Sequence, residues 1–367
     1  MNQVIKRALE IAKKDLRANY GTLGIYAGQK NHREYWSRDS FFATYGACAI
    51  EDFEIVRKNL DLFRRYQREN GQIPLRVEDR NHALNFIHLK VKYDPPVARF
   101  RSSQPWADEV VDASALYIIA ACEYTNKSGD EKWMALAKPN LEKAAEWLWD
   151  RRNDLGLVDE GLVAGWADMT LKSGSVTYTN LCTWKALGDL GWKKEAVELG
   201  KAINKYLWSS GKGYYIDWIN RGNKAYRDFF VDGNVLAVVW GLADLKKAKR
   251  IYEFIDKHGL DTTPTTTCFP ALVWWMDLWV RIIFPWYHTS HSFISWGALS
   301  TLGRKQINDK ARFDKNLISL SKVIVRNRCV PEFVNSQGLM VDTVLYKTER
   351  GLAWNAGLFI YLCDRYN

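Results

Sequence analysis

Two acidic residues stand in loop-like stretches whose neighbours suit acid–base chemistry. Asp168 lies in GLVAGWADMT, two positions after Trp166 and among small apolar residues, and Glu332 lies in VPEFVNSQG. An apolar setting raises the pKa of a carboxyl group toward the value that a general acid needs. Hydrolysis of a glycosidic bond uses two carboxyl groups, one as acid and one as base or nucleophile. We therefore predict that Asp168 is a general acid and Glu332 a general base, with Glu349 as the fallback base.

Each of these acids also has a structural alternative. Asp168 could cap a helix N-terminus, and Glu332 could be an ordinary surface acid. Asp39, Asp112 and Asp232 also precede apolar helical segments, so position before a helix does not by itself single out a catalytic pair.

Loops rich in Trp, Tyr, Arg and carboxylates surround the two acids in the sequence and favour a carbohydrate site. Aromatic faces stack on sugar rings and charged groups bind hydroxyls, and the chain has 17 Trp residues. No glycine-rich phosphate loop is visible, and His288 and His291 have no third ligand, so we expect neither a cofactor nor a metal. The predicted substrate-binding residues are Trp36, Arg38, Asp39, Arg101, Gln104, Trp106, Asp112, Trp166, Asp232, Tyr287, His288 and Trp354.

Helix-like segments of two kinds alternate along the chain. One kind is amphipathic, as in 53–63, 196–206 and 313–323, and the other is apolar nearly all round, which is typical of buried helices. Six outer and six inner segments predict an all-α fold, an (α/α)6 toroid formed by residues 1–367 as a single domain, with at most small hairpins in its loops. Since inner helices of such a ring all run in one direction, the loops that enter them gather at one rim, where we expect the active site. The inner segments are 41–50, 115–122, 180–187, 234–243, 293–299 and 352–363.

Several motifs resemble one superfamily of sugar-cleaving enzymes. YWSRDSFF resembles the Trp-x-Arg-Asp segment of glucoamylases and glycogen-debranching amylo-α-1,6-glucosidases, VVDASALYI and GWADM resemble segments of the debranching enzymes, and VPEFVNSQG with ERGLAWNAGLF is similar to runs of glucoamylases and trehalases. EIVRKNLDLF with GQIPLRV is similar to alkaline/neutral invertase. The resemblance implies an inverting (α/α)6 glycoside hydrolase. It places Arg38 and Asp39 on hydroxyls of the sugar in subsite −1, Asp168 on the general acid and Glu332 on the general base.

The expected reaction is single-displacement hydrolysis of an α-glucoside or short oligosaccharide. Asp168 would protonate the glycosidic oxygen while Glu332 deprotonates a water, and the two carboxyl groups would stand roughly 6.5–9.5 Å apart to admit that water. Two alternatives stay open: a sucrose- or trehalose-cleaving hydrolase on the same scaffold, and a carbohydrate-binding toroid without turnover. The expected partner is therefore an oligosaccharide or disaccharide, and the oligomeric state stays open.

Charge and cysteine usage bear on partners and compartment. The 52 Lys and Arg exceed the 42 Asp and Glu by 10, but apart from KKAKR the two signs alternate along helix-like segments, so we expect a solvated surface and no nucleic acid. Six cysteines without a Cys-x-x-Cys pair predict free buried thiols, and no signal peptide is visible, so we expect a cytoplasmic protein. The apolar stretch 271–286 is too short to cross a bilayer and contains Asp277 and Arg281.

Overall fold

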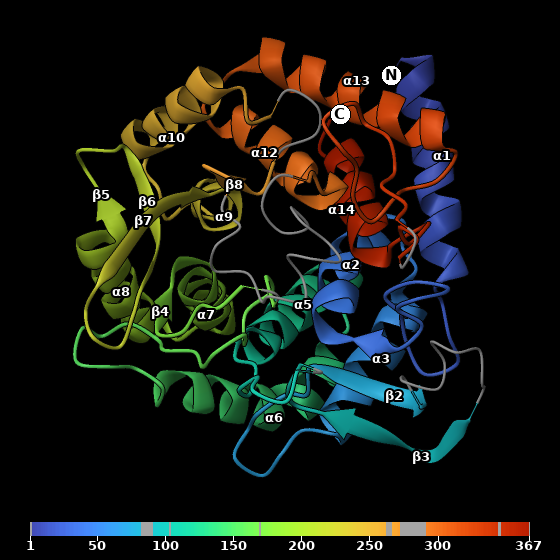
Figure 1. The fold of residues 1–367 in the computed structure, drawn as a ribbon. Coiled ribbons are helices and arrows are strands. Elements are labelled where there is room, and N and C mark those ends of the chain that lie inside the picture. Colours follow the sequence, from blue (N-terminus) through green and yellow to red (C-terminus); the bar gives the residue numbers. More distant parts are fainter. Residues whose placement is uncertain are drawn as a thin grey trace.

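The computed structural model describes residues 2–81, 91–102, 104–168, 170–261, 266–271, 291–343 and 346–366. Two of the predicted substrate-binding residues, Tyr287 and His288, lie outside these ranges, as does nearly all of the apolar stretch 271–286. Helices make up most of the fold and surround its centre (Figure 1). None of the helices in the described ranges is long and apolar enough to cross a membrane.

Within the described residues, six helices form a closed inner ring. Each helix of the ring contacts the next one, and the last contacts the first (Figure 1). They are buried on nearly every face, as the apolar sequence pattern indicated. In order around the ring they are α2 (Ser37–Ala49), α5 (Asp112–Ser128), α7 (Thr177–Leu190), α9 (Val231–Val239), α12 (Ile294–Gln306) and α14 (Ala353–Asp364).

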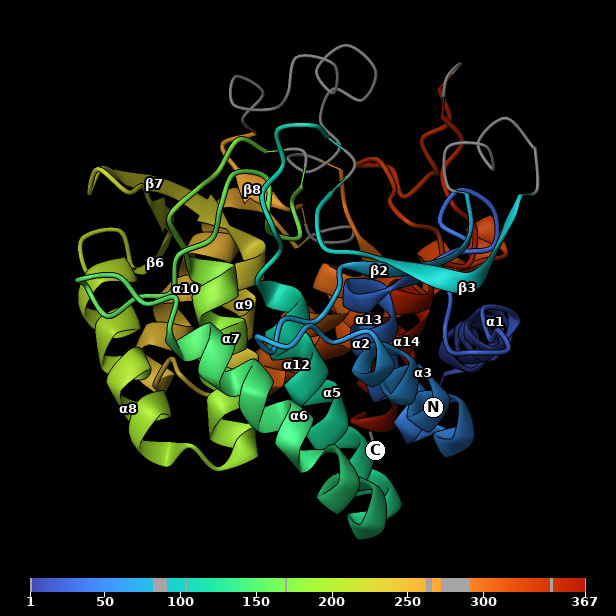
Figure 2. The same ribbon diagram turned by 90° about the horizontal axis from the view of Figure 1, so that it is seen from below.

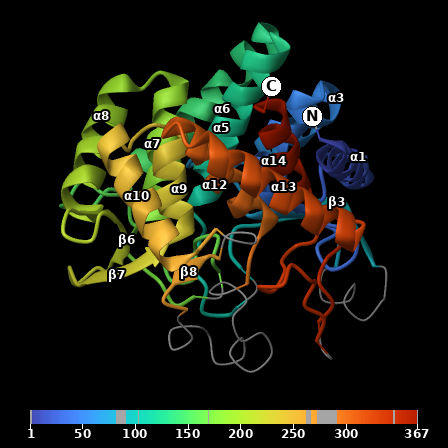
Figure 3. The same cartoon turned by 90° about the horizontal axis from the view of Figure 1, so that it is seen from above.

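Amphipathic helices cover the outside of this ring. α3, for example, buries Val56, Leu60 and Phe63 and turns its charged residues to solvent. Carboxylate N-caps start several of them: Asp130, for one, accepts a hydrogen bond from a backbone N–H in the first turn of α6. Figure 3 shows α1 beside α13, where they contact each other outside α14. The outer helices are α1 (Gln3–Ala18), α3 (Phe53–Arg65), α6 (Glu131–Trp149), α8 (Lys193–Ala202) with the π-helical turn η1 (Ile203–Leu207), α10 (Leu245–His258) and α13 (Lys310–Asn327).

Two glycines let α2 and α14 approach until their backbones touch. A Cβ at Gly46 would lie 2.2 Å from the carbonyl oxygen of Gly357, and one at Gly357 would lie 2.5 Å from the Cα of Ala43. No larger residue fits at either position without moving a helix. This contact closes the ring between its first and last helices.

The prediction of an all-α class needs correction, because the described residues also form two antiparallel sheets. One sheet has the order β1-β2-β3, and the other has the order β4-β6-β7-β8 with β5 paired to β6. The strands are β1 (Tyr35–Trp36), β2 (Arg76–Arg80), β3 (Lys92–Arg99), β4 (Ser175–Val176), β5 (Trp208–Ser209), β6 (Tyr214–Ile219), β7 (Ala225–Phe230) and β8 (Cys268–Phe269).

Their composition explains why the first sheet was missed. β2 and β3 are rich in charges, and β3 contains Pro95 and Pro96, residue types that are depleted in strands. β6, in contrast, consists mostly of Tyr, Ile and Trp, residue types that are enriched in strands.

The sheets lie at the rim where inner helices begin, as Figure 2 shows for β2, β3, β7 and β8. β1, β4 and β7 each end immediately before an inner helix starts, at α2, α7 and α9. The strand residue that precedes each helix is extended and makes no side-chain capping bond. The strands therefore fix the positions of the loops that enter the ring.

Candidate functional site

Asp168 lies in the long loop between α6 and β4 at this rim, and its side chain is 23% exposed. The Oγ of Ser102 donates to its Oδ2 at 3.3 Å, and the Nη1 of Arg38 lies 3.8 Å from the same oxygen. Burial raises the pKa of Asp168, and the positive charge of Arg38 opposes the rise. The carboxyl group is thus partly buried, and it has polar contacts that the local sequence did not reveal.

Arg38 stands in the first turn of α2 with its guanidinium buried. Its Nε and Nη2 donate to the two carboxylate oxygens of Asp112 at 2.6 and 3.1 Å, and Nη2 also donates to the backbone carbonyl of Ala164 at 2.7 Å. Such a fork fixes the plane of the guanidinium. Asp112 was predicted to bind substrate, but it is fully buried with both oxygens held by Arg38, so its place in the structure suits orienting Arg38 instead.

Glu332 lies in the loop between α13 and α14, and its carboxylate is surrounded by donors. The hydroxyl of Tyr346 donates to Oε2 at 2.6 Å, the backbone N–H of Glu349 donates to the same oxygen at 3.1 Å, and the Nε2 of His32 lies 3.4 Å from Oε1. The side-chain amide of Asn355 in α14 also donates to its backbone carbonyl at 2.7 Å. These contacts hold the group in one orientation and suit an ionised carboxylate.

Glu349, the fallback base, has a different arrangement. Its two oxygens accept from the backbone N–H groups of Gln29, Lys30 and Asn31 at distances from 2.6 to 3.3 Å. It therefore holds the turn that carries His32, one residue further along, and its oxygens are already engaged.

His32 links the two candidate acids electrostatically. Burial alone would lower the pKa of His32, but the hydrogen bond and charge of Glu332 outweigh it and raise the pKa to about 9. The resulting positive charge acts on Asp168, whose pKa it lowers, and on Asp39. Burial raises the pKa of Asp39 to about 7, with His32 opposing the rise and Glu332 adding to it.

Sequence reasoning missed His32 and Tyr346. His32 comes before the motif YWSRDSFF. Tyr346 is 14 residues from Glu332 in the chain and meets it only in the folded protein. The only available signal was position: His32 lies three residues before YWSRDSFF, and Tyr346 lies three residues before ERGLAWNAGLF.

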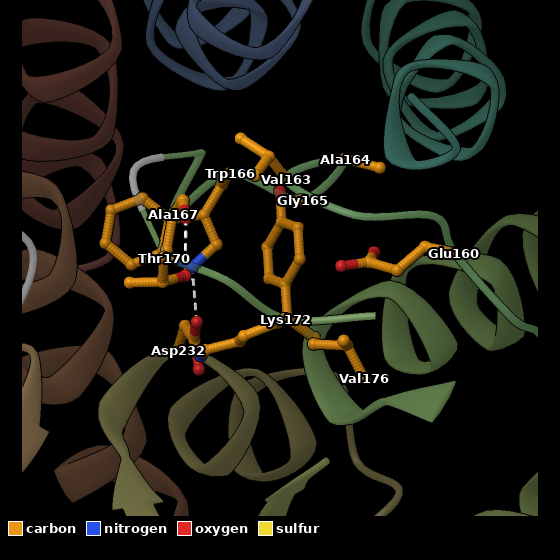
Figure 4. A pocket seen from close by; sticks show the side chains of 11 residues that line it. Glu160, Val163, Ala164, Gly165, Trp166, Ala167, Thr170, Lys172, Val176 and Asp232 are labelled. Atoms are coloured by element: carbon orange, nitrogen blue, oxygen red, sulfur yellow. Dashed lines mark hydrogen bonds between the residues drawn. The ribbon is translucent and has the colours of Figure 1, made fainter. Parts of the chain in front are cut away.

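An aromatic floor lies beneath the site. The ring of Trp166 packs edge-on against Trp354, with centroids 5.9 Å apart, and at a tilt against Trp296, with centroids 5.0 Å apart. The indole N–H of Trp166 donates to the carboxylate of Asp232 (Figure 4). Because Asp232 is buried and holds this indole, it suits positioning Trp166, whereas the sequence predicted contact with substrate.

The other predicted binding residues lie at the edge of the site. The side-chain amide of Gln104 donates to the backbone carbonyl of Asp168 at 3.2 Å, which ties their loops together. Trp36 lies at the end of β1 with the guanidinium of Arg76 over its ring at 4.7 Å. Trp106 is 45% exposed, and the side chain of Arg101 is 61% exposed.

A small cavity of about 10 Å³ lies behind Trp166, and Figure 4 shows its lining. This is roughly the space of a single water. The ammonium of Lys172 is buried there with the carboxylate of Asp217, 2.7 Å away. Glu160 also lines it, accepts a hydrogen bond from Thr179 and has its pKa raised by burial to about 8.

Comparisons with solved structures identify the fold. The chain aligns with a GH63 mannosylglycerate hydrolase from Thermus thermophilus in complex with glucose, at a TM-score of 0.73 and 13% identity, over 96% of this chain and 99% of that one. The chain shares its fold with glycoside hydrolases. It also aligns with a glycosidase variant in complex with glucose (TM-score 0.71, 14% identity, 99% and 98% of the two chains). A rhamnosidase from Klebsiella oxytoca with rhamnose bound gives a TM-score of 0.70 at 13% identity over 100% of this chain, which spans 64% of that enzyme.

No protein-family model matches the chain, and no curated protein matches it.

Proposed function

We propose that this protein is an inverting glycoside hydrolase with Asp168 as general acid and Glu332 as general base. The observation that carries the proposal is the contrast between the two carboxyl groups at one rim of the helical ring. Burial raises the pKa of Asp168, whereas hydrogen-bond donors surround Glu332. Two carboxyl groups in environments that favour opposite protonation states are the usual mark of an acid–base pair. The shared fold with glycoside hydrolases supports the same reaction class.

The reaction follows from these roles. Asp168 donates its proton to the glycosidic oxygen as the bond to the anomeric carbon breaks. Glu332 accepts a proton from a water whose oxygen attacks that carbon from the opposite face, so the anomeric configuration inverts. The geometry required is a carboxyl separation of roughly 6.5–9.5 Å when a sugar is bound.

The sugar that loses its leaving group would lie over the aromatic floor. Trp166 and Trp354 supply the apolar side of this position. Arg38 and Asp39 would bind hydroxyls, and Asp112 fixes the plane of the Arg38 guanidinium. We propose an α-glucoside or short oligosaccharide as substrate. Complexes of two neighbours with glucose support the choice of sugar.

A panel of substrates tests the proposal. Purified protein is incubated with maltose, isomaltose, trehalose, sucrose and glycogen fragments, and released monosaccharide is measured for the native chain and for Asp168→Asn and Glu332→Gln. We expect release from at least one α-glucoside and a loss of at least 1,000-fold in both variants. Cleavage of trehalose or sucrose alone would favour the alternative of a disaccharide-specific hydrolase. Sugar binding without release in the native chain would favour a carbohydrate-binding toroid.

A further inference from the structure

A second cavity, of about 600 Å³ and open to solvent, lies against the β2–β3 hairpin. Its volume is in the range of small-molecule sites. Four arginines line it, together with one buried acid, Glu78. The arginines are Arg68, Arg76, Arg99 and Arg101.

This arginine pocket adjoins the candidate active site along two of its edges. Ser102 lines the pocket and also donates to the carboxylate of Asp168 at 3.3 Å. On the other edge, the guanidinium of Arg76 lies over the ring of Trp36 at 4.7 Å. Strand register explains this second contact, because Arg76 stands directly opposite Trp36 on β1 and directly opposite Arg99 on β3.

The placement of Arg76 opposite Arg99 carries an electrostatic cost, since like charges on paired strands repel. Glu78 offsets part of it by accepting from the Nε of Arg76 at 2.8 Å and from the Nε of Arg99 at 3.1 Å. Each guanidinium carries five N–H donors, and Glu78 accepts one hydrogen bond from each of the two arginines. The side chain of Arg99 is 45% exposed.

A second acid, Glu109, lies close to the other two arginines, Arg68 and Arg101. Glu109 accepts from the Nη1 of Arg68 at 2.6 Å and lies 3.9 Å from the Nη2 of Arg101. Four guanidinium groups thus face two carboxylates, Glu78 and Glu109, and the remaining titratable group in the lining is the phenol of Tyr93. The described groups leave the pocket with a positive charge excess, which is the field that an anionic ligand needs.

We propose that the arginine pocket binds the leaving group of the substrate and that this leaving group carries an anionic function, a carboxylate or a phosphate. The inference rests on the proposed function, because a general acid stands on the side of the departing oxygen and Ser102 places the pocket on the side of Asp168. Guanidinium forks bind both anions in two-point fashion. Hydrolysis adds a water hydrogen to the departing oxygen and a hydroxyl to the anomeric carbon, so the anionic group itself is unchanged and serves for recognition.

Turnover of matched glycosides tests the proposal. The substrates are the α-glucosides of glycolate, of 2-hydroxyethyl phosphate and of glycolamide, the last being a neutral analogue of the first with nearly the same shape. We expect kcat/KM to be at least tenfold higher for an anionic glucoside than for the amide. In Arg99→Gln/Arg101→Gln this ratio should fall toward one, whereas Arg7→Gln, an exposed change on α1, should leave it unaltered.

Binding of the free leaving groups separates this inference from the proposed function. Dissociation constants of glycolate, 2-hydroxyethyl phosphate and glycolamide are measured by ligand-observed NMR, which needs no turnover. We expect the native chain to bind an anion at least tenfold more tightly than the amide. This difference should be lost in the double variant and reduced by salt. The anion that binds more tightly shows whether the leaving group carries a carboxylate or a phosphate. Equal affinities for acid and amide, or a preference that survives in the double variant, would overturn the proposal. Absence of glucoside cleavage would overturn the proposed function, and the binding contrast would still decide the inference.

Discussion

The imidazole of His32 lies with its Nε2 3.4 Å from the Oε1 of Glu332 and 3.1 Å from the hydroxyl oxygen of Tyr346, which itself donates to the other oxygen of Glu332. The candidate base is therefore held from both sides, by one residue far back in the chain and by another that follows it. We expect His32 and Tyr346 to be positioning residues for Glu332.

Replacing His32 by Gln should lower kcat by at least tenfold with a small change in KM, because Glu332 loses a charged neighbour that orients it. The same variant should alter the dependence of stability on pH. The folded pKa of His32, about 9, exceeds the ordinary value of 6.5, so its contribution is complete below about pH 6.5 and is lost as the pH rises through 9. Linkage gives this contribution a size on the order of 3 kcal/mol.

Urea unfolding of the native chain and His32→Gln at pH 6 and pH 10 measures the effect. The native chain should lose more stability between these two pH values than the variant loses. Equal losses would show that His32 is not held in its charged form by Glu332.

The fork between Arg38 and Asp112 gives a second prediction. Arg38→Met leaves the buried carboxylate of Asp112 without its partner and should destabilise the fold by about 3–5 kcal/mol, whereas Arg38→Met with Asp112→Leu should recover much of this loss. Chemical denaturation of Arg38→Met, Asp112→Leu and the double variant measures the coupling energy between the two residues. Additive losses, with no recovery in the double variant, would contradict an energetic coupling between Arg38 and Asp112. Arg38→Met and the double variant should both lose activity, because the guanidinium of Arg38 also lies near the carboxylate of Asp168.

Glu160 gives a prediction in which the substituted protein is more stable than the native chain. Burial raises its pKa to about 8 from 4.5, so the folded state retains a proton that the unfolded state releases, and stability falls as the pH rises from 4.5 to about 8. Glu160→Gln removes this ionisation and should make the protein more stable than the native chain at pH 8, while the two differ less at pH 4.5. Thermal unfolding at both pH values checks it, and a variant that is less stable at pH 8 would refute it.

Asp232 offers a test of the aromatic floor. Asp232→Ala leaves the indole N–H of Trp166 buried without its acceptor and should cost about 1–3 kcal/mol of stability. If Asp232 acts by positioning Trp166, KM for the substrate should rise, and Asp232→Asn, which keeps an acceptor, should recover much of the affinity. Equal KM values in the Ala variant and the native chain would argue against a positioning role.

The ring of helices could be predicted from sequence because burial leaves a periodic signature. Segments such as 234–243 are apolar on every face, and their alternation with amphipathic ones indicated inner and outer positions. The β1-β2-β3 sheet had no such signature, since β2 is mostly charged and β3 contains charges and two prolines.

The candidate acids were found by their local setting and by resemblance, but their surroundings were not. The contacts of Arg38 with Asp112 and of His32 with Glu332 join residues far apart in the chain, and a single sequence carries no record of such pairs. For the same reason the sequence did not show that Asp112 and Asp232 are buried and contact Arg38 and Trp166.

The configuration of the first product tests the central claim most directly. Proton NMR of the anomeric signals, recorded in the first minutes after an α-glucoside is added, distinguishes the newly formed sugar before mutarotation mixes the anomers. We predict initial release of the β anomer, with no release by Asp168→Asn or by Glu332→Gln. Initial release of the α anomer, or full activity in either variant, would contradict single displacement by Asp168 and Glu332.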